Sequence, residues 1–201
     1  MKQEQNSPLT ILMALVVIMA TALGLSFIVS GVWIKAKAEL AQVLLDRSFE
    51  QTVAEGKPVK PWGWADMTPL ARITAKRLDQ STIVLSSTSG QSLAFGPGHM
   101  SNTPLPGEQG TAVLAAHRDT HFAWIKHLRP GDNIQITGNT GEIKSFTMRR
   151  AWIAPYDQSG INADSNEHLL ALTTCYPFDS NEQGEERYIV EAVLTDQITR
   201  F

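Results

Sequence analysis

The chain has 201 residues, enough for one domain of ordinary size together with an additional segment. Lysine and arginine number 17 against 20 aspartates and glutamates, so the formal net charge is −3 and the sequence pI is about 5.9. This balance provides no basic surface of the kind that binds nucleic acid, and it excludes that class of function.

An uncharged run of 26 residues, from Leu9 to Ile34, predicts a transmembrane helix. A helix of this length measures about 39 Å, more than the roughly 30 Å thickness of the hydrocarbon core of a bilayer. A cleavable signal peptide is the alternative, because Ala36 to Ala38 reads Ala-Lys-Ala, but the apolar region of a signal peptide usually has only about 7 to 15 residues. We therefore expect residues 1–34 to form an N-terminal tail and a retained transmembrane anchor.

The charges beside this run do not set one orientation clearly. Lys2 precedes the run, whereas Lys35 and Lys37 follow it, which weakly opposes a cytoplasmic N-terminus. A long domain is nonetheless translocated largely regardless of nearby charge, and about 165 residues follow the run. We therefore expect a cytoplasmic N-terminus and a folded domain on the other side of the membrane.

Residues 35–69 are expected to form an amphipathic helix followed by a linker. Apolar residues at spacings of three and four predict a helix of about five turns that stops near Gly56 and Pro58. Those apolar residues are Leu40, Val43, Leu44, Phe49 and Val53. The linker contains Trp62 and Trp64, whose indoles could cover the core of the domain or lie at a membrane interface, and covering the core is the more common use.

From residue 70 to residue 201 the pattern changes to short strand-like runs separated by turn residues. Eight such runs predict an all-β fold, a closed or nearly closed β-barrel with short helices. The runs are residues 71–78, 81–87, 92–96, 111–117, 133–138, 142–154, 169–175 and 187–195. One short helix is expected over residues 119–128, with Asp119 or Thr120 as its N-cap and Pro130 beyond its end.

Cys175, the only cysteine, stands at the end of the run 169–175. It has no partner for an intramolecular disulfide and no companions for a metal site, so packing or nucleophilic chemistry remains. Alternation along the run places Leu170 and Leu172 on an apolar face and Cys175 on the opposite one. Arg187 likewise avoids the apolar face of the last run, and both placements favour a reactive thiol over a buried one.

A nucleophilic cysteine needs a histidine or a cation nearby, because a thiol with the usual pKa of about 8.5 is mostly protonated at neutral pH. His117 is the first candidate, since it terminates a strand-like run and can present its imidazole at the edge of a barrel. His121 is the second candidate. The remaining histidines are His99, His127 and His168.

Three segments of the chain, in this order, resemble the sortases, which are membrane-anchored cysteine transpeptidases. The segments are GPGHMSNTPLPGEQGTAVLAAHRDTHF, LLALTTCYPF and EERYIVEAVL. The family's Thr-Leu-x-Thr-Cys motif matches residues 172–175, with Ala171 in place of the first threonine. Its catalytic histidine matches His117, and its catalytic arginine matches Arg187, twelve residues after the cysteine. The resemblance spans residues 70–195.

The resemblance implies an eight-stranded sortase-like barrel with His117, Cys175 and Arg187 as catalytic residues and with substrate contacts at Thr173 and Thr174. Cys175 would attack a Thr–Gly-type bond in the C-terminal sorting signal of an exported protein and form a thioester, which an amine acceptor would resolve. His117 would transfer protons, and Arg187 would stabilise the oxyanion. No cofactor is implied. No metal is expected either, since no dense acidic cluster stands beside the barrel strands.

The anchor, the following helix and the barrel together look most like the sortases of Gram-negative proteobacteria. This likeness implies a single-pass protein of the inner (cytoplasmic) membrane with its catalytic domain on the periplasmic, extracytoplasmic side.

Two alternatives from other classes stay open. An L,D-transpeptidase is also an exported, β-rich cysteine enzyme, but its cysteine stands in a Gly-Cys-Arg context, whereas Cys175 follows Thr174 and precedes Tyr176. A non-catalytic, membrane-tethered β-domain that binds peptides would not need an ionisable cysteine, histidine and arginine acting together. The reactivity of the Cys175 thiol distinguishes the two alternatives, because the cysteine enzyme needs a reactive thiol and the non-catalytic domain does not.

Overall fold

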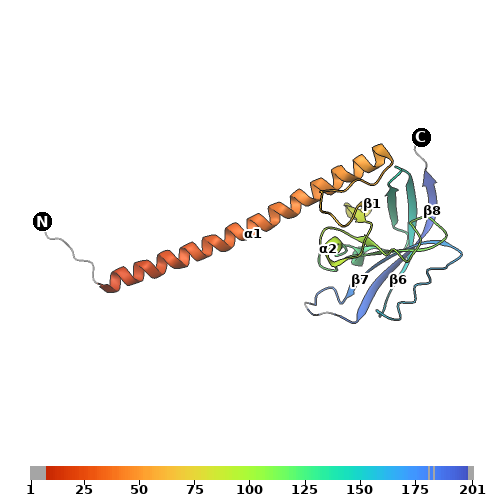
Figure 1. Cartoon of the computed structure of the whole chain (residues 1–201). Helices are drawn as coiled ribbons and strands as arrows, with labels where there is room; N and C mark the ends of the chain where they lie inside the picture. Colours follow the sequence, from red (N-terminus) through yellow and green to blue (C-terminus); the bar gives the residue numbers. More distant parts are fainter. Residues whose placement is uncertain (1–7, 181, 183, 199–201) are drawn as a thin grey trace. The chain divides into compact units, whose positions relative to one another are not determined.

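The computed structural model describes residues 8–180, 182 and 184–198. The chain divides into two compact units between Ala41 and Gln42. One uninterrupted helix, α1 (Pro8–Glu55), contains both the predicted transmembrane run and the predicted amphipathic helix (Figure 1). The division into domains at residues 34 and 69 stays a prediction.

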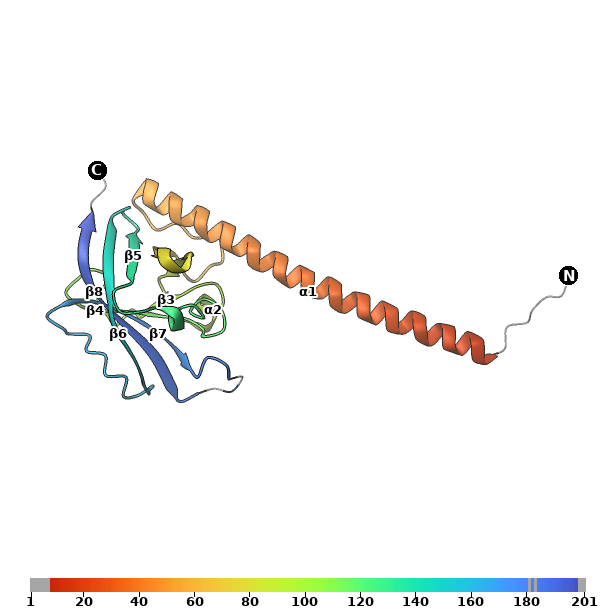
Figure 2. The ribbon, with the colours of Figure 1, turned by 180° about the vertical axis from the view of Figure 1, so that it is seen from behind.

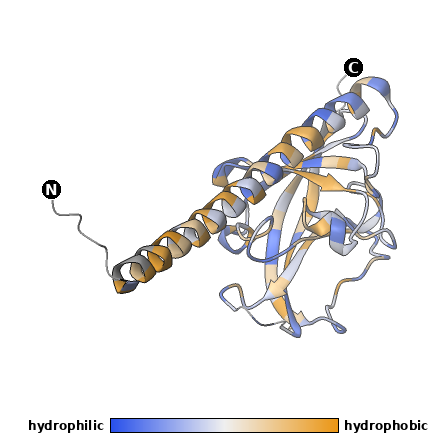
Figure 3. Cartoon of the chain, turned by 60° about the vertical axis from the view of Figure 1, so that its left-hand side comes forward, coloured by the Kyte–Doolittle hydropathy of each residue, from blue (hydrophilic) through white to orange (hydrophobic). Residues whose placement is uncertain are grey.

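The N-terminal unit is the apolar part of α1, where hydrophobic residues predominate (Figure 3). Every large apolar side chain described between Leu9 and Ile34 is more than half exposed, from 52% at Val16 to 70% at Phe27. Among the described residues, α1 is the one helix that is long and apolar enough to cross a membrane. Such exposure suits a helix whose surface is covered by lipid.

The C-terminal turns of α1 carry an apolar face that includes the expected Phe49 and Val53 but not all of the expected positions. Leu45 and Phe49 are buried, whereas Leu40 and Val43, which were expected on this face, are 57% and 63% exposed. Leu45 and Phe49 belong to a small hydrophobic cluster separate from the barrel interior. Its buried residues are Leu45, Phe49, Ala65, Met67, Ile83 and Leu85. The spacing of four between residues 45 and 49 keeps both side chains on one side of the helix, and that side faces the linker and the strand with Ile83 and Leu85.

The helix ends where the sequence predicts. Gly56 has a φ of +66°, and its N–H donates to the carbonyl of Thr52 at 3.0 Å, which is the left-handed C-terminal cap that glycine favours. In the linker, the Trp62 ring meets Phe95 edge to face with 5.0 Å between ring centroids, so Trp62 covers the core as expected. Trp64 is 83% exposed.

Eight strands close into a barrel in the order β1-β2-β3-β4-β7-β8-β6-β5, which confirms the predicted fold class (Figures 1 and 2). The strands are β1 (Pro69–Ala75), β2 (Gln80–Leu85), β3 (Gly98–His99), β4 (Gly110–Ala115), β5 (Asn133–Gly138), β6 (Ile143–Pro155), β7 (His168–Tyr176) and β8 (Glu186–Ile198). The pairs β2–β3 and β4–β7 are parallel, and the others are antiparallel. Seven of the eight predicted runs overlap these strands.

The run 92–96 is the exception, because a short helix, α2 (Gly90–Leu93), begins before it and the strand β3 follows it. The Ser89 hydroxyl accepts the N–H of Ser92 at 3.1 Å, which caps the helix and draws the chain out of an extended conformation. The prediction of a strand at 92–96 was therefore wrong.

The predicted helix over 119–128 is also wrong, because this segment forms turns and a short 3₁₀ helix, η2 (Ile125–His127). The backbone N–H groups of Ile125, His127 and Leu128 donate to carbonyls three residues earlier, at 3.0 to 3.3 Å, which is the 3₁₀ pattern. A further 3₁₀ turn, η1 (Lys76–Leu78), joins β1 to β2.

The strands β7 and β8 bury different residues on their two faces. Leu170 and Leu172 of β7 and Val190 and Ala192 of β8 are buried in the barrel interior, as the alternation predicted. The opposite faces of these strands form a smaller buried cluster outside the barrel. Its fully buried members are Val113, Ala171 and Ile189, with Met100, Trp152, Ala154 and Ile161 packed against them.

Candidate active site

Strand register places Cys175 directly opposite Arg187 on the antiparallel pair β7–β8. Residues opposed in this way have Cβ atoms about 4.5 to 5.5 Å apart. Thr173 is likewise opposite Ile189, two residues further along each strand, on the same outer face. Both Cys175 and Arg187 are partly buried, so each is held by the sheet yet reaches its surface.

His117 reaches the same end of the barrel through the parallel pair β4–β7. Ala115 pairs with Thr173, and the N–H of Ala116 donates to the carbonyl of Thr173 at 3.2 Å, which carries the pairing past the end of β4. His117 follows directly and is exposed. Strand pairing therefore places the three predicted catalytic residues at one end of the barrel.

The two threonines of the motif have different environments. Thr174 is only 2% exposed, and its hydroxyl donates to the carbonyl of Ala116 at 2.7 Å, which fixes the end of β4 just before His117. Thr173 is partly buried on the outer face and lines a groove. Of these two residues, Thr173 is the one placed to contact a ligand, and contact with substrate stays a prediction for both.

A groove of about 380 Å³ lies on the outer face beside Arg187. Its floor comes from β4 and β7, and one wall comes from the segment that joins β6 to β7. The residues that line it are Met100, Asn102, Thr103, Val113, Ala115, Tyr156, Ser159, Ile161, Ala163, Thr173 and Arg187. Its mixed lining of apolar and hydroxyl-bearing side chains suits an extended, largely uncharged peptide.

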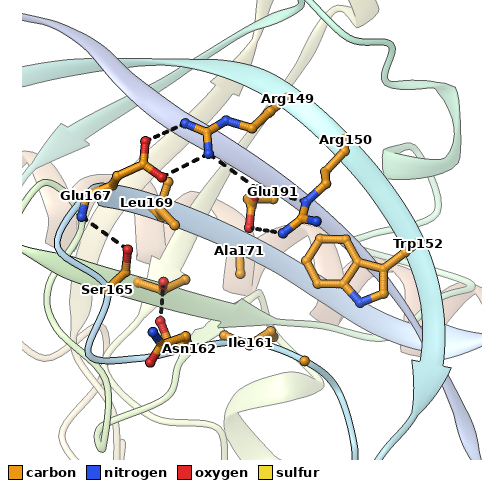
Figure 4. Close-up of a pocket in the computed structure, with 12 residues that line it drawn as sticks. Arg149, Arg150, Trp152, Ile161, Asn162, Ser165, Glu167, Leu169, Ala171 and Glu191 are labelled. Atoms are coloured by element: carbon orange, nitrogen blue, oxygen red, sulfur yellow. Dashed lines mark hydrogen bonds and ion pairs between the residues drawn. The ribbon is translucent and has the colours of Figure 1, made fainter.

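Three contacts fasten the segment between β6 and β7. Figure 4 shows the residues that line a cavity of about 200 Å³ beside this segment. Trp152 Nε1 donates to the carbonyl of Ser159 at 2.9 Å, and the Thr111 hydroxyl donates to the carbonyl of Asn162 at 2.7 Å. Arg149 makes two hydrogen bonds to the Glu167 carboxylate, at 2.6 and 2.9 Å. The groove wall is thus held at three points along its length.

Charged groups meet in pairs around this cavity. The Arg149 guanidinium holds the pKa of the Glu167 carboxyl below its usual value. Glu191, which is 7% exposed and opposite Ala171, receives two hydrogen bonds from Arg150, at 2.9 and 3.0 Å. These pairings leave the cavity with little net charge.

Arg187 is held by backbone carbonyls. Its Nη1 donates to the carbonyls of Gly184 and Glu186, both at 2.9 Å, and its guanidinium carbon lies 5.7 Å from the centroid of the Tyr156 ring. The remaining guanidinium nitrogens of an arginine held in this way can serve a substrate oxygen without a change in the strand.

His121 is partly buried near His117. Burial lowers the pKa of His121 below its usual value, and the nearby His117 acts in the same direction, whereas a hydrogen bond from the imidazole to the Ala94 backbone carbonyl and the charge of Asp119 raise that pKa. This lowered pKa favours the neutral form of the His121 imidazole.

Several residues at this end of the barrel were not found by sequence reasoning. Tyr156, Ser159 and Ile161 line the groove, but they lie in a segment without periodicity, and only the fold brings them to β7. Arg118 was visible in the segment AAHRDTHF directly after His117, and adjacency to a candidate base was the signal that could have found it. Among the described residues, no group of three or more His, Cys, Asp and Glu side chains is arranged to hold a metal ion.

Comparison with known proteins gives a consistent match. A family model for the sortase domain matches residues 73–195. Sortase D of Bacillus subtilis (strain 168) is 32% identical over 107 residues, which are 53% of this chain and 54% of that protein. The chain therefore spans about half the length of this curated relative.

Solved structures have the same fold. A Clostridium perfringens Sortase D5 transpeptidase aligns with a TM-score of 0.62 at 24% identity, covering 79% of this chain and 99% of that one. The catalytic domain of B. anthracis SrtD aligns with a TM-score of 0.55 at 29% identity, covering 66% and 90%. Clostridium perfringens sortase C, solved with the C-terminal cell wall sorting motif, has a TM-score of 0.58 at 19% identity, covering 80% and 90%. The expected likeness to proteobacterial sortases in particular is not supported by these relatives.

Proposed function

The chain belongs to the sortase family, and from this we propose that it is a membrane-anchored cysteine transpeptidase acting on exported proteins that carry a C-terminal sorting signal. The main observation behind the proposal is strand pairing, which puts His117, Cys175 and Arg187 at one end of the barrel. A groove lies beside Arg187. The solved Clostridium perfringens relative is described as a transpeptidase, which supports the same type of reaction.

In the first step, the Cys175 Sγ, as a thiolate, attacks the carbonyl carbon of a Thr–Gly-type bond. The carbonyl oxygen becomes an oxyanion, and a free guanidinium N–H of Arg187 stabilises that charge. When the tetrahedral intermediate collapses, the C–N bond breaks, and the His117 imidazolium protonates the leaving amine. The products are a thioester on Cys175, a free amine and a neutral imidazole.

In the second step, a primary amine of the acceptor attacks the thioester carbon. His117 takes the proton from that amine, the C–S bond breaks, and the thiolate of Cys175 is restored. The substrate leaves joined to its acceptor by a new amide bond. Water in place of the amine gives hydrolysis by the same route.

The groove beside Arg187 is the proposed place for the sorting signal. Thr173 and the segment with Tyr156 and Ile161 offer contacts along its length. Thr174 is placed to act indirectly, since its buried hydroxyl holds the chain at Ala116 next to His117. The sortase C that shares this fold was solved with its C-terminal cell wall sorting motif, which supports a sorting signal as the ligand.

The exposed apolar part of α1 supports the proposed location. We infer that residues 1–34 anchor the chain in the cytoplasmic membrane by a single span, with the barrel on the extracytoplasmic side, where exported substrates arrive. The chain is expected to need no cofactor and no metal, since the two proposed steps use only the three side chains. Membership of the sortase family disfavours both an L,D-transpeptidase and a non-catalytic peptide-binding domain.

Mass spectrometry of the acyl-enzyme tests the proposal. The full chain in detergent is incubated with a synthetic peptide that contains a Thr–Gly-type sorting signal, and the expected result is a mass increase at Cys175 equal to the acyl part of the peptide. An added amine should discharge this adduct, and Cys175→Ala should form none. Absence of any adduct over a set of such peptides, together with a thiol that does not react with iodoacetamide, would contradict the proposal.

A further inference from the structure

Arg118 joins the segment after β4 to the loop between β7 and β8. It follows His117 directly and is partly buried. Its Nη2 donates to the carbonyls of both Ser180 and Glu182, which lie in that loop. The loop connects the strand with Cys175 to the strand with Arg187. Arg118, the neighbour of the proposed base His117, therefore holds the loop that connects the strand of Cys175 to the strand of Arg187.

Gly184 shows how closely the loop returns over the end of β7. A Cβ placed at Gly184 would lie 2.1 Å from the carbonyl oxygen of Tyr176 and 3.7 Å from Nη1 of Arg118. The carbonyl of the same glycine accepts a hydrogen bond from Arg187 Nη1 at 2.9 Å. Arg118 and Arg187 thus hold one loop from two sides, and the glycine leaves room for both.

The hydrogen bonding of Arg118 is incomplete. Its Nη1 is buried and has no hydrogen-bond partner among the described residues. Leaving a buried donor unpaired costs free energy, so a buried arginine nitrogen in this state needs a structural explanation. Both acceptors of Arg118 are backbone carbonyls bonded by one nitrogen, Nη2, whose two N–H directions are fixed by the planar guanidinium.

We propose that Arg118 is a positioning residue that fixes the β7–β8 loop, so that Arg187 stays opposite Cys175 and His117 faces both. The inference rests on the proposed function and goes beyond it, because Arg118 contacts neither the reacting atoms nor the groove lining. Arg118 acts through its hydrogen bonds to the backbone carbonyls of Ser180 and Glu182. Its loss should therefore lower kcat more than it changes KM.

The test compares Arg118→Lys with Arg77→Lys in the full chain in detergent. Arg77 is a matched control, since its guanidinium also bridges two acceptors, the carbonyl of His127 and the Asp132 carboxylate. We expect Arg118→Lys to lower kcat for transpeptidation by about 10- to 100-fold, the size of effect that a displacement near 1 Å can cause. KM should change by less than about threefold. Arg77→Lys should leave both constants within about twofold.

Two further measurements make the result decisive. Hydrogen–deuterium exchange of the β7–β8 loop should become faster in Arg118→Lys while exchange in the barrel strands stays unchanged. Gly184→Ala, whose added methyl would press against the Tyr176 carbonyl, should reproduce the loss of kcat by displacing the same loop.

Three outcomes would overturn the inference: Arg118→Lys that keeps more than about half of wild-type kcat, unchanged loop exchange, or a loss of kcat that accompanies unfolding of the barrel. The exchange measurement needs no substrate. Faster loop exchange in a protein that never forms an acyl-enzyme would support the fastening of the loop and reject the proposed function instead.

Discussion

Cys175 and Arg187 owe their proximity to one register pair, and that pair lies on the face of β7 and β8 that points away from the barrel interior. The barrel core therefore does not depend on the thiol. His117 adds an imidazole from a third strand end, and the hydroxyl of Thr174 fixes that end. The barrel interior includes none of the proposed catalytic residues His117, Cys175 and Arg187. We therefore expect substitutions at these three positions to leave the barrel folded.

Replacement of Cys175 by alanine should remove activity and keep the fold. We expect transpeptidation and hydrolysis to fall by at least about 10³-fold, since no other thiol can form the acyl-enzyme. The free energy of unfolding should change by less than about 1 kcal/mol, because the side chain is only partly buried. Peptide turnover and thermal unfolding measure the two effects. An unfolded variant, together with a wild-type thiol inert to alkylation, would indicate a cysteine kept for packing.

The two neighbouring histidines should differ in their importance. His117→Ala should lower turnover by about 10² to 10⁴, the usual contribution of a general acid and base. His121→Ala should lower it by less than about tenfold, because the strand pairing that carries His117 to the end of β7 does not include His121. Steady-state kinetics of both variants check the assignment. It would be reversed if His117→Ala stayed active while His121→Ala lost all turnover.

Arg187→Lys keeps the positive charge and loses the planar set of donors. We expect kcat/KM to fall by about 10² to 10³, as for the loss of one oxyanion donor. The melting temperature should change little, since the Nη1 contacts to Gly184 and Glu186 are made at the edge of the barrel. A variant that keeps more than about a third of wild-type kcat/KM would remove Arg187 from the catalytic set.

At the scale of elements, strands with a strong apolar pattern could be predicted and segments shaped by local capping could not. The runs that became β4 and β7 are short and continuously apolar, and the run that became β8 has apolar residues at 188, 190, 192 and 194; the structure confirms all three as strands. The run 92–96 is equally apolar, but a serine cap turns it into a helix. Cys175, His117 and Arg187 were visible because they end or begin strands. The groove was not, because its wall is a loop that only the parallel pairing of β4 with β7 brings into place.

The turn before β5 is expected to give the fold an acid-sensitive contact. Asp132 accepts two hydrogen bonds from Arg77, both at 2.5 Å, and the N–H of Arg129 at 2.7 Å. The hydrogen bond from Arg77 is the main cause that holds the pKa of Asp132 below its usual value. A carboxyl with a lowered pKa in the folded state stabilises the fold above its unfolded pKa of about 3.9. That contribution disappears as the pH falls through the lower, folded value.

We therefore expect Asp132→Asn to lower the melting temperature at pH 7, and the difference from wild type to shrink below about pH 4. Thermal unfolding from pH 3 to pH 7 measures it. Asp196→Asn, at an exposed position of β8, is the control and should show a small difference at every pH. A difference for Asp132→Asn that stays constant down to pH 3 would contradict the argument.

At the scale of the whole molecule, the continuous helix α1 predicts the topology. Protease added to spheroplasts should digest the chain after about Lys35, while an N-terminal tag stays protected. The physical reason is the uncharged run before Lys35, whose exposed side chains need a lipid environment. Immunoblots against tags at both ends check this orientation, and intact inverted vesicles provide the control. A barrel digested only in inverted vesicles would place it in the cytoplasm.

The parallel pairing of β4 with β7 also bears on when the protein becomes able to react. It joins residues 110–115 to residues 168–173, and β8 must then be added to supply Arg187. Contacts between such distant parts of a chain form late in folding, because a long loop has to be closed first. Until the barrel closes, we expect Cys175 to lie apart from His117 and Arg187, its proposed base and oxyanion donor. We therefore expect the proposed chemistry to begin only after barrel closure.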